Sequence, residues 1–440
     1  MSVLPLPSRP ALWLVFPGLI LVWVYAALYI SDAAIRGHWV AAMSNAALFL
    51  LFSCGLAALS AAIEGSRDRS GKLGDLAVVR SSWHIAAQRL WPSLLAGATV
   101  QTVGTLFLAS AAFGAPGRPP WELPVAYVAI VFFHASLGYA LGRFLPAIAA
   151  IPLSMLSSYG WLGFTWSVPY FPLRHLAGPA LASCCGPASE LNPLAVWAPI
   201  AFSIPAGVLL LALVALNPPV GRAERARVGR RRARAAMAVA SGLVACLAVV
   251  TACSLFLARN VGAFAYQDRP ESELECSGQR PRICLFPEQL ASSDPRPVLA
   301  AAFSRLEAAG MPLFMAVNAG VGDSNPTDAI AVVAVGIRSS EAELIHAAAS
   351  AYTAPLTGID CGATDYRPWL RAYGILSAWL ELEASKGVVA PERVRAGVAR
   401  DTLDDLDHLQ ARPLGEQREW IRSALESLKR CEAVSPDDAP

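Results

Sequence analysis

Residues Gly221–Leu257, GRAERARVGRRRARAAMAVASGLVACLAVVTACSLFL, separate two parts of the chain that differ in character. Seven arginines lie between Arg222 and Arg234. The residues that follow, Ala235–Leu257, carry no charge and exceed the about 20 apolar residues that a bilayer-spanning helix needs. Lys and Arg stay on the cytoplasmic side of such a span. The residues after Leu257 are therefore predicted to lie outside the cell.

The composition excludes an ordinary soluble protein. The 440 residues are 55% hydrophobic and 15% charged, with a mean hydropathy of +0.46, whereas globular chains carry about 25% charged residues. Residues 1–257 hold 17 Lys and Arg against 7 Asp and Glu, and residues 258–440 hold 18 against 26. This split indicates two environments. Because the arginines border apolar spans, the basic charge does not indicate a nucleic-acid partner.

Seven apolar stretches predict an α-helical polytopic membrane protein with about seven spans, because runs of this length in lipid favour helices. The predicted domains are a six-span membrane domain at 1–216, an Arg-rich cytoplasmic loop with a seventh span at 217–257, and an extracytoplasmic domain at 258–440. The lipid bilayer is the first expected partner. The stretches are 11–30, 40–63, 92–113, 124–142, 145–166, 196–216 and 235–257.

Charge fixes the expected orientation. With the N-terminus inside, the cytoplasmic segments hold 14 Lys and Arg and the short outer loops hold three, which agrees with the positive-inside rule. An abundance of Ala, Arg, Gly and Pro is typical of a GC-rich bacterial genome, so we expect the bacterial plasma membrane. The fourth and fifth stretches lie so close together that a tight hairpin and a broken helix both stay open.

Beyond Ala258 the pattern predicts an α+β domain, mainly helical, of a size that supports its own core. Short apolar runs at Met311–Val317 and Ala329–Val335 are consistent with buried strands. Helical patterns occupy Pro295–Gly310, Glu341–Tyr352, Pro368–Lys386, Pro391–Gln410 and Glu416–Lys429.

Six of the nine cysteines fall on the side predicted to be outside, where disulfides persist. The preferred pairs are Cys276–Cys284, which closes a small loop, and Cys361–Cys431, which ties the last helix back. Four cysteines allow three connectivities, and the sequence does not choose among them. Adjacent Cys184 and Cys185 pair with each other, pair elsewhere or stay free. No CxxC spacing supports zinc.

The predicted spans contain no Asp, Glu, Lys or Arg, and this weakens the case for an ion-coupled carrier. His134 is the exception among titratable groups, and interhelical hydrogen bonding is its expected role. The segment Gly65–Leu73, GSRDRSGKL, lacks the spacing and the Ser or Thr of a phosphate loop. If transport needs ATP, a separate ATP-binding subunit must therefore hydrolyse it, and no cofactor is expected here.

The outer domain shows no catalytic motif such as HExxH or GxSxG, so no enzymatic activity is expected. Its best constellation of possible metal ligands has a spacing that places four side chains on one helix face. A solvated acidic face is the favoured interpretation, and a divalent-cation site is the weak alternative. The residues are Asp401, Asp404, Asp405 and His408.

The inner loop at 64–91 contains an amphipathic pattern, in which apolar residues recur at helical spacing between basic ones. Two interpretations stay open: a helix at the membrane interface, and a docking helix for a cytoplasmic partner. The docking candidates are Leu76, Val79, Arg80, Trp83 and Arg89.

The order of these features resembles the permease subunits of type-2 ABC exporters, over about residues 11–216. In that family the first inner loop docks on the ATPase, which maps to Leu76–Leu90, and the outer loop before the sixth span forms short helices, which maps to Tyr170–Leu194. With its stretch Cys276–Gln289, CSGQRPRICLFPEQ, the chain also looks like actinobacterial permease-like proteins with an extracytoplasmic cysteine-containing domain. The seventh span departs from the exporter pattern.

The resemblance implies a non-catalytic, permease-like subunit that works with a separate ATPase, as a homodimer or with a second permease. The cargo would be a peptide, a lipid or a drug-like molecule, and the direction of transport stays open. The alternative is a membrane-anchored receptor or interaction protein that senses an envelope ligand through its C-terminal domain.

Overall fold

The structure is a computed structural model that describes residues 10–30, 35–70, 81–178, 186–216, 230–291, 293–320, 330–356, 359 and 367–432. The side chains of residues 70, 166, 230–237, 240 and 401 are not among those described. Contacts divide the chain into unit 1, residues 1–185 and 189–267, and unit 2, residues 186–188 and 268–440. The sequence predicts this boundary at residue 257, and the contacts place it at Gln267.

Unit 1 is helical, and the described residues include the seven predicted helices that are long and apolar enough to span a membrane. Several of these helices are longer than the apolar stretches predicted from the sequence. Their helical backbone continues into neighbouring residues that are charged or polar. These helices are α1 (Pro10–Tyr29), α3 (Trp39–Asn45) with η2 (Ala46–Phe49) and α4 (Leu50–Ser70), α5 (Ser82–Ala109) with η4 (Ser110–Ala112), α6 (Glu122–Phe144), α7 (Ala147–Tyr159) with the π-turn η5 (Gly160–Phe164), α9 (Pro193–Leu216) and α11 (Arg230–Ala258).

The fourth and fifth apolar helices, α6 and α7, form a hairpin. The backbone leaves the helical conformation at Leu145 and Pro146. His134 Nδ1 lies 3.0 Å from Ser158 Oγ, and these residues are almost equally far from the break on either side. Only two helices that run back along each other bring them together, so the broken-helix alternative is wrong.

Small residues let α4 and α6 approach closely. A Cβ atom added at Gly138 would overlap the carbonyl oxygen of Ala58, and one added at Gly142 would overlap that of Ala62. Both glycines lie on one face of α6, one helical turn apart. Close backbone approach at small residues is the usual way in which helices pack inside membranes.

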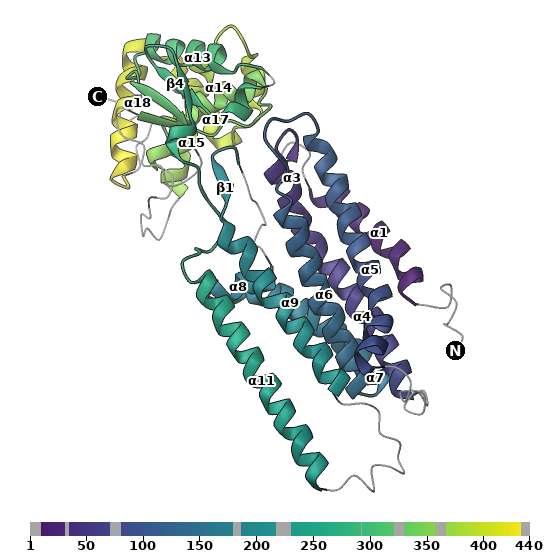
Figure 1. The fold of residues 1–440 in the computed structure, drawn as a ribbon. Coiled ribbons are helices and arrows are strands. Elements are labelled where there is room, and N and C mark those ends of the chain that lie inside the picture. Colours follow the sequence, from purple (N-terminus) through teal and green to yellow (C-terminus); the bar gives the residue numbers. More distant parts are fainter. Residues whose placement is uncertain are drawn as a thin grey trace. The chain divides into compact units, whose positions relative to one another are not determined.

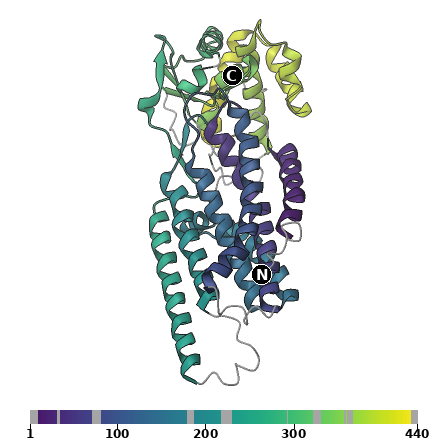
Figure 2. The same cartoon turned by 45° about the vertical axis from the view of Figure 1, so that its right-hand side comes forward.

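Two helices lie at opposite edges of this bundle, α1 beside α4 and α5, and α11 beside α8 (Phe171–Ala177) and α9 (Figures 1 and 2). Their outward faces are apolar and exposed; Phe16 of α1 is 71% exposed and Val244 of α11 is 67% exposed. Exposed faces of this kind are the surfaces that lipid covers in membrane proteins.

Unit 2 contains a four-stranded sheet in the order β3–β4–β5–β6, with β3 (Glu275–Ser277), β4 (Arg282–Leu285), β5 (Ala316–Ala319) and β6 (Ile330–Val333). The first pair is antiparallel, and the other two are parallel. Ile283, Val317 and Ala331 are direct neighbours across three strands, and all three are buried. The two predicted strands are thus present, although β5 begins only at Ala316.

Helices complete unit 2 and supply most of its core, in which Trp379 and Trp420 are fully buried. Four predicted helices are confirmed. The prediction of one helix over Pro391–Gln410 is wrong, because the backbone is extended at Ala399 and divides it in two. The helices are α12 (Pro287–Leu290), α13 (Arg296–Ala308), α14 (Glu341–Ser350), α15 (Arg367–Ser385), α16 (Pro391–Arg395), α17 (Arg400–Gln410) and α18 (Leu414–Lys429).

A two-stranded ribbon that the sequence did not predict pairs β1 (Ser189–Leu191) with β2 (Tyr266–Asp268). Next to the ribbon, the backbone N–H of Asn192 donates to the Ala265 carbonyl at 2.9 Å. The segment before α9 and the segment after α11 therefore run side by side. Residues 186–188, which come from the loop between the fifth and sixth helices, belong to unit 2.

The predicted Cys276–Cys284 disulfide is confirmed, with a sulfur–sulfur distance of 2.05 Å. The two cysteines face each other across β3 and β4. Cys431 is disulfide-bonded, whereas its predicted partner Cys361 lies outside the described residues, as do Cys184 and Cys185. Among the described residues, the free cysteines are Cys54, Cys246 and Cys253.

Candidate functional site

The last turns of α4 carry two carboxylates that are almost completely buried, Glu64 at 1% exposure and Asp68 at 4%. Both face Arg89 of α5, whose Nη1 lies 3.5 Å from Glu64 Oε2 and whose Nε lies 3.2 Å from Asp68 Oδ1. The hydroxyl of Tyr139, on α6, donates to Asp68 Oδ2 at 2.7 Å. We call these four residues the ion cluster. They join three helices at the end of the bundle where α4 leads into residues 71–80.

The ion cluster is incompletely hydrogen-bonded. Glu64 Oε2 and Asp68 Oδ1 lie within ion-pair distance of Arg89 but accept no hydrogen bond from a described residue. The distance satisfies an ion pair, while a hydrogen bond also requires alignment. The Arg89 guanidinium is thus shared between two carboxylates, and Glu64 Oε1 also accepts a hydrogen bond from Arg67 Nη1 at 3.1 Å. Buried ion pairs of this kind add little net stability. Such a cluster links the three helices.

The structure describes two of the five docking candidates, and both lie on α5. Leu76, Val79 and Arg80 lie outside the described residues. Trp83 is 45% exposed in the first turn of α5, and Arg89 belongs to the ion cluster. From Ser82 onward the predicted amphipathic segment is the beginning of α5 and not a separate helix. A docking role for these residues stays a prediction.

The apolar stretch 40–63 contains no acidic residue, but the helix that carries it runs from Trp39 to Arg69 and includes both carboxylates. The sequence did contain a signal for their burial. Ala57, Ala61, Glu64 and Asp68 follow one another at spacings of three or four, so the buried face of α4 continues into the charged segment.

Neutral polar groups are paired farther along the same bundle. Gln101 of α5 accepts from Ser53 at 2.9 Å and donates to the Ala46 carbonyl at 2.8 Å. The hydroxyls of Ser60 and Ser93 are 2.8 Å apart. These contacts join α5 to α4 and η2 by hydrogen bonds, as is usual between helices in membranes.

The predicted interhelical hydrogen bond of His134 is confirmed by its contact with Ser158. His134 is fully buried, and its second ring nitrogen, Nε2, has no hydrogen-bond partner among the described residues. Ser136, two residues further along α6, also carries a buried hydroxyl without a described partner.

A second buried histidine, His175 of α8, ties the loop before α9 to the segment after α11. Its Nε2 donates to the Gly262 carbonyl at 2.9 Å. Burial lowers the pKa of His175, against the effect of this hydrogen bond, which favours the protonated ring. The neutral imidazole is therefore the form that closes this contact near neutral pH.

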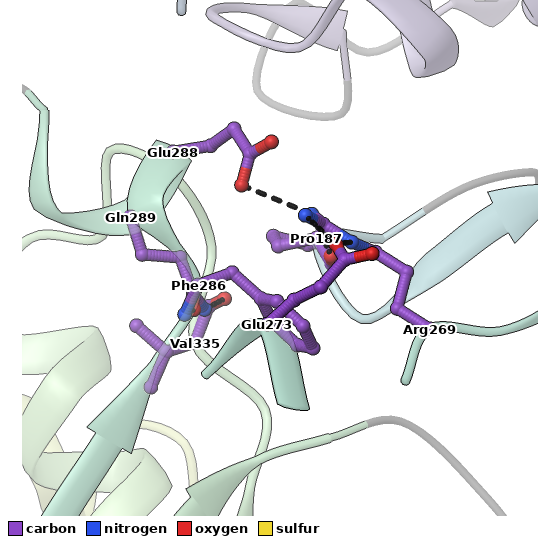
Figure 3. Close-up of polar contacts among 7 residues, drawn as sticks. All are labelled: Pro187, Arg269, Glu273, Phe286, Glu288, Gln289 and Val335. Atoms are coloured by element: carbon purple, nitrogen blue, oxygen red, sulfur yellow. Dashed lines mark hydrogen bonds and ion pairs between the residues drawn. The ribbon is translucent and has the colours of Figure 1, made fainter. Parts of the chain in front are cut away.

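Arg269 is the centre of a different charged group, in unit 2 (Figure 3). Its guanidinium donates to Glu273 at 2.6 Å, and to Glu288 and the Pro187 carbonyl at 2.9–3.0 Å. It also lies 4.3 Å above the ring of Phe286. Burial opposes the charge of Arg269, yet the two carboxylates hold its pKa above the ordinary value. This group fastens residues 186–188 to unit 2.

The acidic face of α17 does not form a metal site among the described residues, where no group of three or more His, Cys, Asp or Glu is placed to hold a metal ion. Asp405 pairs with Arg371 at 2.5 Å. Asp404 and His408 are exposed, and the side chain of Asp401 is outside the description. A solvated acidic face stays the favoured prediction.

Comparison with known proteins gives one match. Residues 283–431, most of unit 2, match a family model described as "Domain of unknown function (DUF7224)". No curated protein and no solved structure matches the chain. The match begins inside β4 and ends at Cys431, so it leaves the seven apolar helices uncovered.

Proposed function

We propose that the chain is a multi-pass protein of the bacterial plasma membrane, with its N-terminus in the cytoplasm and unit 2 outside. The seven apolar helices, the cytoplasmic excess of Lys and Arg, and the disulfide in unit 2 support this orientation. An odd number of crossings sends the two ends of the chain to opposite sides.

We further propose that unit 1 is a permease-like subunit of an exporter whose ATPase is a separate chain, working as a homodimer or with a second permease. The ion cluster is the observation that carries this proposal. It joins α4 and α5, the helices before and after residues 71–80, to each other and to α6. A force that a docked subunit applies to this part of the chain would therefore reach the bundle through Arg89.

Co-purification from the native membrane tests this function. We expect an ATP-hydrolysing subunit to accompany the full chain. Replacing Leu76, Val79 and Trp83 together by Asp should reduce its recovery at least tenfold while the chain still inserts. The matched control is Trp121→Asp, since Trp121 is similarly exposed at the opposite end of the bundle. Absence of any ATPase beside a folded wild-type chain would contradict the proposal.

The receptor alternative rests on unit 2, which has its own buried core and contains the whole family match. The Arg269 group and the β1–β2 ribbon connect it to the chain before α9 and after α11. A receptor would bind an envelope ligand without stimulating ATP hydrolysis. Cargo-stimulated hydrolysis by the purified complex therefore decides between the two functions.

A further inference from the structure

His134 presents a hydrogen-bond acceptor that the described chain leaves unused. Ser158 donates its single hydroxyl proton to the Ser154 carbonyl at 3.0 Å. Both hydrogen bonds of Ser158 form together only if its oxygen accepts from His134 Nδ1. The ring then carries its proton on Nδ1, and the unpartnered Nε2 is a bare acceptor. A buried acceptor without a donor destabilises a protein, so a donor that reaches Nε2 would gain binding energy there.

This acceptor lies near the middle of the proposed membrane. His134 is ten residues before the end of α6 at Phe144, a distance of about 15 Å along the helix axis. The hydrocarbon core of a bilayer is about 30 Å thick. An ionisable side chain at this depth marks a binding or transport site by default, because the surrounding lipid offers it no partner.

One aromatic ring lies next to the ring of His134, and two more follow from it. The ring of Phe133 lies 5.1 Å from that of His134 and 5.2 Å from that of Phe202, which stacks on Trp161 at 5.4 Å. These residues come from α6, α9 and η5. Aromatic faces of this kind suit both an alkyl chain and an ammonium group.

The helix that carries Ser158, α7, has an exposed apolar side. Its outward side chains are exposed, with Ile148 at 88% and Leu156 at 67%. Pro152 interrupts its hydrogen bonding, and the π-turn that follows contains Gly160, which has open space around it. Prolines and π-turns permit local rearrangement and recur at functional sites.

We infer that His134 Nε2 receives a hydrogen bond from a cargo molecule with an amine or hydroxyl headgroup on an apolar chain, which enters from the bilayer beside α7. This inference rests on the proposed transport function and adds the class of cargo. The headgroup would donate to Nε2, while its chain lies against the aromatic rings and the lipid.

Binding of simple amphiphiles to the full chain in lipid nanodiscs tests the inference. The probe is a long-chain amine that carries a photoreactive diazirine, displaced by dodecylamine, dodecanol or dodecyltrimethylammonium. The last compound has the charge and chain of the amine but no donor. We expect at least one of the two donor compounds to compete at about tenfold lower concentration than the trimethyl compound, the value of a buried hydrogen bond. Which one does so identifies the headgroup.

His134→Asn isolates the acceptor, because the Asn amide can still donate to Ser158 but has no atom at the position of Nε2. This variant should lose the preference for donor compounds and keep its melting temperature. Ser136→Ala, which removes the other unpartnered polar group of α6, should keep the preference. Equal competition by all three compounds in the wild type, or a preference that survives in His134→Asn, would overturn the inference. No ATPase is present, so failure of the docking experiment leaves this result intact.

Discussion

Arg89 in unit 1 and Arg269 in unit 2 each face two carboxylates, but the two sites differ in how completely their hydrogen bonds are formed. Arg269 makes aligned bonds to Glu273 and Glu288 and stacks on an aromatic ring. Arg89 approaches Glu64 and Asp68 without aligned bonds. Complete pairing fixes a geometry, and incomplete pairing leaves alternatives of similar energy. The contacts of Arg269 therefore define one geometry, whereas Arg89 is shared between two carboxylates without an aligned hydrogen bond to either.

The pair His346–Glu381 gives unit 2 a measurable dependence on pH. Glu381 lies 2.9 Å from His346 Nδ1 and raises the pKa of the histidine above 6.5. The stabilisation is therefore complete below pH 6.5 and disappears as the pH rises through the raised pKa of the folded state. Because the histidine is 64% exposed, the effect is below about 1 kcal/mol.

His346→Gln should lower the urea midpoint of unit 2 at pH 5.5 and leave it unchanged at pH 8.5, measured by pulse proteolysis of the full chain with detection of its C-terminal fragment. Arg296→Gln serves as the control, since its partner Asp294 stays ionised across this range and the effect of its loss is the same at both values. An equal loss at both values for His346→Gln would show that the histidine contributes through packing and not through charge.

At the scale of single elements, the α4–α6 contact depends on glycine. In Gly138→Ala the added methyl group overlaps the backbone of Ala58, which cannot move aside as a side chain does. Overpacking of this kind costs about 1–3 kcal/mol, so we expect a melting temperature several degrees lower in detergent. Gly242→Ala, in α11, is the matched control, because nothing lies within 4 Å of its added methyl group. Similar melting temperatures for both variants would contradict the close contact.

Most of these elements are predictable from local sequence patterns. The length of the apolar stretches predicts the seven helices, and hydrophobic periodicity predicts α13, α14, α15 and α18. Both signals come from residues that are close together in the sequence. The β1–β2 ribbon has strands of three residues, separated by two apolar helices, and its pairing is a long-range contact with no local signal. The ion cluster was missed for a different reason. The sequence predicts an inner loop from Glu64 onward, because the apolar stretch ends at residue 63, whereas Arg89 and Tyr139 become partners of Glu64 and Asp68 only after folding.

At the scale of the whole molecule, the division into units follows contacts and not sequence order. Residues 186–188 join unit 2 although more than seventy residues separate them from Asp268. Unit 2 is therefore connected both to the loop before α9 and to the segment after α11, and the Arg269 group holds these two segments together.

The orientation of the whole chain can be measured with reporter fusions. In the proposed topology, seven crossings place the end of the chain opposite its beginning, and removal of α11 reverses the side on which the chain ends. Alkaline phosphatase, which is active only outside the cytoplasm, should be active when fused after Pro440 and inactive when fused after Leu216. A green fluorescent protein fused at the same two positions should give the opposite pattern. In the intact protein, Cys276 and Cys284 should react with a membrane-impermeant thiol reagent on whole cells only after reduction. Phosphatase activity after Leu216 but not after Pro440 would require the reverse orientation, with the Arg222–Arg234 cluster outside the cell and against the charge bias.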